Sequence, residues 1–166
     1  MPYGATAAGY DAEVDVIRPV LALIHIGSAL LYVSGFASTK MLTAMALAEP
    51  DASRRRVLFG IGDRFDFRFQ ILGGTLVGVS GIPLAFATGY GLTHAWVLAS
   101  IVLYAIVVFI GAVIWRRRSI AVRAALDAGD DDLVVRLLRE PRAQLLRWVE
   151  TALVVTIVVL MVLRPG

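Results

Sequence analysis

Cysteine is absent from this chain of 166 residues. Its absence excludes disulfides, cysteine-ligated metal sites and thiol catalysis together. The chain also lacks a nucleophile–base pair, a phosphate-binding glycine loop and a zinc-ligand spacing, which argues against a hydrolase or a nucleotide-driven machine. The first 17 residues are acidic, with no basic segment before the first apolar run. We therefore expect that run to be retained as a membrane anchor and not cleaved as a signal peptide.

Hydrophobic residues make up 58% of the chain, and the mean hydropathy is +0.77. Soluble domains carry about 45–50% apolar residues. A helix needs about 20 apolar residues to cross a bilayer core of about 30 Å. Four blocks are long enough: 19–38, 69–89, 95–115 and 145–163. The sequence therefore predicts a single four-span transmembrane domain over 1–166, with no room for a soluble domain.

Basic residues fall on alternate connections between these spans. Fourteen of the 16 lie between the first and second spans or between the third and fourth, whereas the termini hold only Arg18 and Arg164. By the positive-inside rule, both basic connections face the cytoplasm and both termini face outward. The net charge of +3 is interpreted as this topology signal, and no nucleic-acid binding is expected.

The predicted architecture is an all-α, antiparallel four-helix bundle in lipid, with an amphipathic helical hairpin between the third and fourth spans. The first helix is expected to continue through 41–48, because Pro50 disfavours helix at Glu49.

The hairpin is expected to have an apolar face on each of its helices. These faces consist of Ile120, Ala124 and Ala125 on the first helix, and of Val134, Leu137 and Leu138 on the second. Residues Asp130–Asp132 are placed to cap the second helix. We expect the hairpin to lie on anionic lipid, and the alternative is a docking surface for a partner.

Small residues are frequent in the second span, where Gly74 and Gly78 form a GxxxG pair. The first span offers Gly27 and Gly35 in return. Close backbone approach drives helix association in lipid, so we expect these glycines to pack the two helices together. The alternatives are a homodimer seam and room for a flat cofactor such as haem.

Two histidines are candidate ligands. His25 lies about two turns inside the first span, at a depth of about 10 Å for a rise of 1.5 Å per residue. An ionisable side chain within a span suggests function, and a neutral imidazole ligates haem iron or copper. A hydrogen bond to a neighbouring helix is the alternative. His94 lies at the outer mouth of the third span and is the candidate second ligand.

Charged residues at the cytoplasmic ends of the second and fourth spans form a predicted ion-pair cluster of Asp66, Arg68 and Glu150. Glu150 lies within about a turn of Arg147, which suggests an interfacial ion pair. The alternatives for Glu150 are an ion pair with Arg64 or Arg68, and a proton-accepting role.

Short motifs link the chain to known membrane families. The segment LIHIGSALLYVSGF at 23–36 resembles the opening shared by CopD-type copper-resistance proteins and HemJ-type haem-pathway proteins. The segments ATGYGL at 87–92, WVLASIVLY at 96–104 and LMVLRP at 160–165 are more similar to an uncharacterised bacterial family of four-helix integral membrane proteins, of unknown function and distantly similar to both. The resemblance implies a four-helix fold in the bacterial inner membrane and a haem or metal role for His25.

Three functions follow as hypotheses, and a non-enzymatic role is favoured. The first is an accessory or assembly subunit of a larger membrane complex, whose partners are other membrane subunits or a second copy of the chain. The second is a haem b- or copper-handling protein with His25 as ligand. The third, ranked last, is a small transporter or channel, because the helices carry few polar residues.

Overall fold

The computed structural model describes residues 7–164, and every regular element in that range is helical. The elements are α1 (Ala7–Ala48), α2 (Ala52–Phe65), η1 (Asp66–Ile71), α3 (Leu72–Ala87), α4 (Ala95–Phe109), η2 (Ile110–Trp115), α5 (Arg116–Ala128), α6 (Asp131–Arg139) and α7 (Pro141–Leu163). Here η1 and η2 are single π-helical segments.

Four helical stretches in the described range are long and apolar enough to cross a membrane: Val16–Ala48, Ala52–Ala87, Ala95–Ala128 and Pro141–Leu163. The predicted four-span, all-α fold is thus confirmed. The first three stretches are longer than the predicted spans, at 33, 36 and 34 residues. At 1.5 Å per residue they reach about 50 Å, well beyond a hydrocarbon core of about 30 Å.

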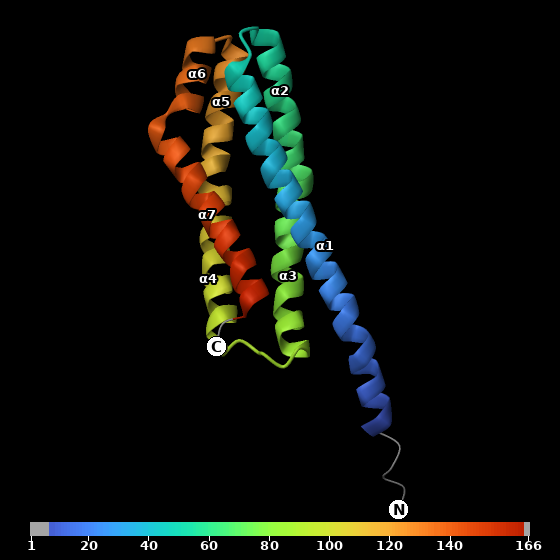
Figure 1. Ribbon diagram of the computed structural model, residues 1–166. Helices are drawn as coiled ribbons and strands as arrows, with labels where there is room; N and C mark the ends of the chain where they lie inside the picture. The colour runs from blue at the N-terminus through green and yellow to red at the C-terminus, as the bar shows by residue number, and fades with distance from the viewer. Residues whose placement is uncertain (1–6, 165–166) are drawn as a thin grey trace, which may run out of the picture.

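The helices are arranged as two halves (Figure 1). In the first half, α1 packs along α2, η1 and α3, and in the second half α7 packs against α4. Figure 1 shows the α1–α2 turn and the α5–α6 hairpin at one end of the molecule, and the α3–α4 loop at the other. We call the first of these the basic end, because α2 and α5 both bring runs of arginine to it.

The α5–α6 hairpin has the predicted helix break, and part of its apolar face is covered by protein. Gly129 ends α5 in the left-handed region at a φ of 72°, and the Asp130 side chain caps α6 by accepting a hydrogen bond of 2.9 Å from the Leu133 N–H. The apolar faces pack on each other and on the ends of α1 and α2, through Val122, Ala125, Leu126, Val134, Leu138, Leu47 and Phe59. Ile120, expected on the apolar face, is 61% exposed. Part of the expected face is thus covered by protein, and contact of its exposed part with lipid stays a prediction.

Consecutive arginines of α2 hold this hairpin. Arg55 is buried, and its guanidinium donates hydrogen bonds to the Asp131 carboxylate at 3.2 Å and to the Glu49 carbonyl at 2.9 Å. Arg56 donates to the Leu126 carbonyl in the last turn of α5. A cation that bonds the free carbonyls of a helix C-terminus satisfies them and opposes the helix dipole. Arg55 and Arg56 therefore hold the hairpin in place, in addition to adding positive charge at the basic end.

Candidate functional site

A cavity of about 800 Å³ lies between the two halves and is lined by residues of every element from α1 to α7. Both π-helical segments form part of its wall, η1 through Asp66 and Gln70 and η2 through Gly111 and Trp115. A π-helical turn interrupts the regular packing of a helix and occurs frequently at functional sites. Its presence in two spans around one cavity marks this region as the candidate site.

The polar core of the cavity is Glu150, which is only 3% exposed. Its Oε2 accepts a hydrogen bond of 3.0 Å from the Trp115 indole and lies 3.7 Å from the Lys40 ammonium. Its Oε1 has no hydrogen-bond partner among the described residues. A buried carboxylate is costly unless it is paired, and within a membrane span it marks a functional region.

Lys40 reaches this carboxylate from α1. Its ammonium also donates a hydrogen bond of 3.0 Å to the Arg147 carbonyl and lies 4.2 Å from the centroid of the Phe36 ring. An ammonium over an aromatic face gains a favourable cation–π interaction. Lys40 therefore connects the first half of the molecule to α7 in the second half.

This pairing differs from the predicted cluster of Asp66, Arg68 and Glu150. Among the residues that the structure describes, neither Asp66 nor Arg68 has an ion pair. Arg147, the expected partner one turn from Glu150, instead places its guanidinium 5.6 Å from the centroid of an indole ring of η2. Lys40 of the facing helix therefore supplies the charged partner of Glu150, while Arg147 lines the same cavity against the Trp115 ring.

The middle of the bundle closes the other end of the cavity with aromatic and aliphatic side chains. Tyr104 donates a hydrogen bond of 2.6 Å to the Gly74 carbonyl and so links α4 to α3. The Tyr32 hydroxyl is buried and has no hydrogen-bond partner in the described part of the chain. Phe36 and Val107 continue this wall. The cavity thus changes from apolar near the middle of the bundle to charged near the basic end.

The glycines mark where helices approach most closely. A Cβ at Gly35 would lie 2.6 Å from the backbone nitrogen of Gln70, and one at Gly73 would lie 2.5 Å from that of Tyr32, so α1 touches η1 at the first position and α3 at the second. Gly73 was not among the predicted packing glycines. By contrast, a Cβ at Gly27 would meet nothing within 4 Å, so the predicted packing role of Gly27 is not what the structure shows.

The predicted GxxxG pair faces aromatic rings of the same chain. A Cβ at Gly74 would lie 3.3 Å from the Tyr32 ring, and one at Gly78 would lie 3.0 Å from the Tyr104 hydroxyl. Both glycines therefore make room for tyrosines that line the cavity.

His25 is buried between α1 and α3, outside the lining of the central cavity. Its Nδ1 lies 3.1 Å from the Ser80 hydroxyl, which itself donates to the Leu76 carbonyl at 2.6 Å. The Ser80 hydroxyl has one hydrogen, so its bond to Leu76 fits the tautomer in which His25 donates from Nδ1 and keeps a lone pair on Nε2.

His94 has different surroundings from His25. It precedes α4, and its Nδ1 is hydrogen-bonded to the Tyr90 carbonyl. Its ring lies edge-on to the Tyr90 ring at 5.2 Å. The two histidines have different hydrogen-bond partners, and the described residues contain no group of three or more metal-ligating side chains. The pairing of the two histidines in one site stays a prediction.

Comparison with known proteins gives one finding. A family model described as "Predicted integral membrane protein (DUF2269)" matches residues 19–165. The expected resemblance to an uncharacterised family of integral membrane proteins is thus confirmed, and a similarity to CopD-type or HemJ-type proteins is not shown. No curated protein and no solved structure matches the chain.

Proposed function

We propose that this chain, which belongs to the DUF2269 family of predicted integral membrane proteins, binds a small amphipathic molecule in the central cavity. The observation that carries the proposal is a buried carboxylate, Glu150, with one oxygen unpaired, in the wall of a cavity of about 800 Å³. Such a group is destabilising in an empty apolar bundle, and a ligand that brings polar atoms compensates for it.

The size and the composition of the cavity support this role. Pockets for small molecules are typically about 300–1,000 Å³ and combine a mostly apolar lining with a few polar groups. Here the apolar wall includes Tyr32, Phe36 and Val107, and the polar groups include Lys40 and Glu150. An apolar body fits the first set, and a polar head fits the second.

A filling substitution tests the proposal. Gly111 lines the cavity, and a Cβ there would meet nothing within 4 Å, so the site has room for a side chain to begin. We expect Gly111→Leu to lose small molecules that co-purify with the wild-type protein, as measured by mass spectrometry of organic extracts.

The matched control is Gly27→Leu, in a span and equally free of contacts, but outside the cavity lining. It should retain the same molecules as the wild type. Identical extracts from all three proteins, or none above the lipid background, would contradict the proposal.

Handling of haem b or copper through His25 is a second candidate, and one observation favours it. The hydrogen bond from Nδ1 to Ser80 orients the ring and leaves Nε2 with a lone pair, as is common for metal-bound histidines. The test prepares the wild-type protein and the His25→Ala variant with both haem and copper available. Absorbance then measures the bound haem, and metal analysis measures the bound copper, in each protein. Equal loading of the two proteins would remove this candidate.

The accessory-subunit role remains a proposal compatible with ligand binding. Its support is the outer surface of α7, where branched aliphatic side chains such as Val155 and Val162 are 55% and 72% exposed. Other membrane subunits or a second copy would cover such a face. Co-purification from native membranes in mild detergent tests this role, and a monomer with no other subunit would count against it.

For location we propose the bacterial inner membrane, with both termini outside and the basic end in the cytoplasm. The support is the distribution of the basic residues, of which 14 of 16 belong to the two connections near the basic end.

A further inference from the structure

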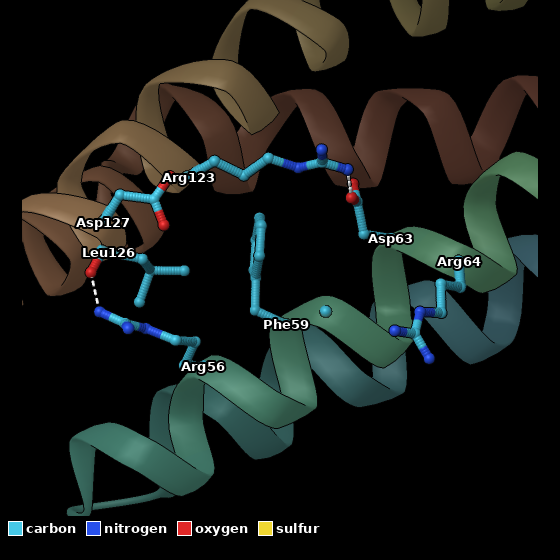
Figure 2. Close-up of a pocket in the computed structure, with 8 residues that line it drawn as sticks. Arg56, Phe59, Asp63, Arg64, Arg123, Leu126 and Asp127 are labelled. Carbon is cyan, nitrogen blue, oxygen red and sulfur yellow. Dashed lines mark hydrogen bonds and ion pairs between the residues drawn. The ribbon is translucent and has the colours of Figure 1, made fainter.

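A second, smaller pocket of about 290 Å³ lies at the basic end, between α2 and α5 (Figure 2). We call it the vestibule. Its lining includes three arginines, Arg56 and Arg64 from α2 and Arg123 from α5, and two aspartates, Asp63 and Asp127. Phe59 stands at its centre (Figure 2).

The vestibule adjoins the central cavity. Phe59, Asp63 and Arg123 line both spaces, so these three side chains form the partition between them. Figure 2 shows two bridges from α2 to α5, one from Arg56 to the Leu126 carbonyl and one from Asp63 to Arg123, with the Phe59 ring between them. A ligand that passes from the vestibule into the central cavity therefore meets this ring and the Asp63–Arg123 pair.

The charge available in the vestibule is positive. The Asp63 carboxylate is already occupied, by the Arg123 guanidinium and by a hydrogen bond of 2.9 Å from the Ser119 hydroxyl. Arg64 is exposed and forms no ion pair within the described range, and Arg123 keeps 59% of its side chain exposed. Asp127 is the remaining acidic group of the lining.

Beyond the partition, basic side chains again outnumber acidic ones. The central cavity is lined by Lys40, Arg116, Arg118 and Arg147 in addition to Arg123, against Asp63, Asp66 and Glu150. The path from the surface to the polar end of the cavity is therefore basic throughout.

We propose that the ligand of the central cavity carries an anionic carboxylate or phosphate group on its apolar body, and that the vestibule arginines receive this group. The inference rests on the proposed function. Guanidinium groups bind both kinds of anion through paired, charge-assisted hydrogen bonds. The anion offers Arg123 a substitute for Asp63, so the partition opens by exchange of one partner for another and leaves no guanidinium unpaired.

Four probes separate the contribution of an anionic head group to binding from that of a twelve-carbon alkyl chain. The probes are dodecyl phosphate, dodecanoate, dodecanol and inorganic phosphate, titrated into the protein in phosphatidylcholine nanodiscs. We expect the first two to bind at least about tenfold more tightly than dodecanol, because an anionic head gains charge-assisted hydrogen bonds that a neutral hydroxyl does not. Dodecanol that binds as tightly as the anions overturns the anionic class. Inorganic phosphate that binds as tightly as dodecyl phosphate overturns the apolar body.

The vestibule is tested with Arg64→Gln, since Arg64 is exposed and forms no ion pair with any residue that the structure describes. We expect it to weaken the anionic probes about five- to tenfold through loss of one charge-assisted contact, and to leave dodecanol unchanged. Arg117→Gln is the control, an exposed arginine of α5 outside both linings. Equal effects of the two substitutions would overturn the vestibule as the receiving site.

The partition has a separate variant, Phe59→Ala, which should speed association of the anionic probes in stopped-flow fluorescence. An unchanged rate would overturn the route past Phe59.

If Gly111→Leu weakens every alkyl probe while Arg64→Gln changes none, the cavity binds ligand but the anionic class fails. If Gly111→Leu affects no probe, the proposed function itself fails.

Discussion

At the scale of single residues, Glu150 and Lys40 explain how a charge is kept inside the bundle. Each comes from a different half of the molecule, and the Trp115 indole donates a further hydrogen bond to the Glu150 carboxylate. Removal of one partner leaves the other charge buried and uncompensated, which costs more than removal of both. The two charges are therefore expected to behave as a unit.

A double-mutant cycle measures this unit. Glu150→Gln should lower the free energy of unfolding by about 2 kcal/mol, below the roughly 3–5 kcal/mol of a fully buried pair, because the Lys40 side chain is 29% exposed. The double variant of Lys40→Met with Glu150→Gln should lose less than the sum of the single variants. Unfolding in detergent with urea provides the measurement, and strict additivity would contradict the pairing.

Arg55 and Arg54 are neighbours in sequence with opposite roles. Arg55 is 8% exposed and bonds Asp131 of α6, whereas Arg54 is exposed. We expect Arg55→Ala to lower the free energy of unfolding by about 1.5–3 kcal/mol, since its hydrogen bonds involve charged groups. Arg54→Ala should change it by less than about 0.5 kcal/mol. A similar loss in both variants would show that net charge at the basic end, and not the Arg55 bonds, stabilises the hairpin.

At the scale of elements, the contact of α1 with α3 depends on which glycines face the partner helix. Gly73 brings the α1 and α3 backbones together and Gly35 does the same for α1 and η1, while Gly27 lies on an open face of α1. In lipid such close approach replaces the hydrophobic effect as the source of helix association. Substitution of these glycines therefore measures the α1–α3 contact directly.

The expected outcome is opposite for two alanine variants. Gly73→Ala should lower the free energy of unfolding by about 1–3 kcal/mol, because the new methyl group overpacks against the Tyr32 backbone. Gly27→Ala should be neutral or slightly stabilising, since alanine has the higher helix propensity. Thermal unfolding in nanodiscs compares the two, and equal midpoints would contradict the packing.

At the scale of the whole molecule, the structure consists of two halves that are bridged at the basic end and enclose a cavity nearer the middle. The bridges are polar and lie near the basic end, where arginines bond helix ends and carboxylates. Asp63 and Arg123, which join α2 to α5, also line the cavity, so the same residues join the halves and form its wall.

The proposed orientation is testable because the chain has no cysteine of its own. We expect Thr93→Cys, in the α3–α4 loop, to react with a membrane-impermeant maleimide in intact cells. Ala128→Cys, at the end of α5, should react only after the cells are permeabilised. Both positions are exposed in the structure. The reverse pattern would invert the proposed topology.

The sequence by itself determined the four spans, the end of α1 and the break at Gly129. Hydropathy, proline and glycine act through near neighbours in the chain, and those neighbours are visible in the sequence. It also singled out Glu150 and His25 as polar residues inside spans, because an ionisable group in lipid is costly wherever it points.

Only the tertiary structure decided which residues meet. It pairs Glu150 with Lys40 and His25 with Ser80, places Gly73 and not Gly27 at the close contact, and turns the hairpin face onto α1 and α2. Each of these depends on the rotation of one helix about its axis relative to another. That rotation is set by packing between distant segments, so hydropathy along the chain predicts the helices but not the cavity between them.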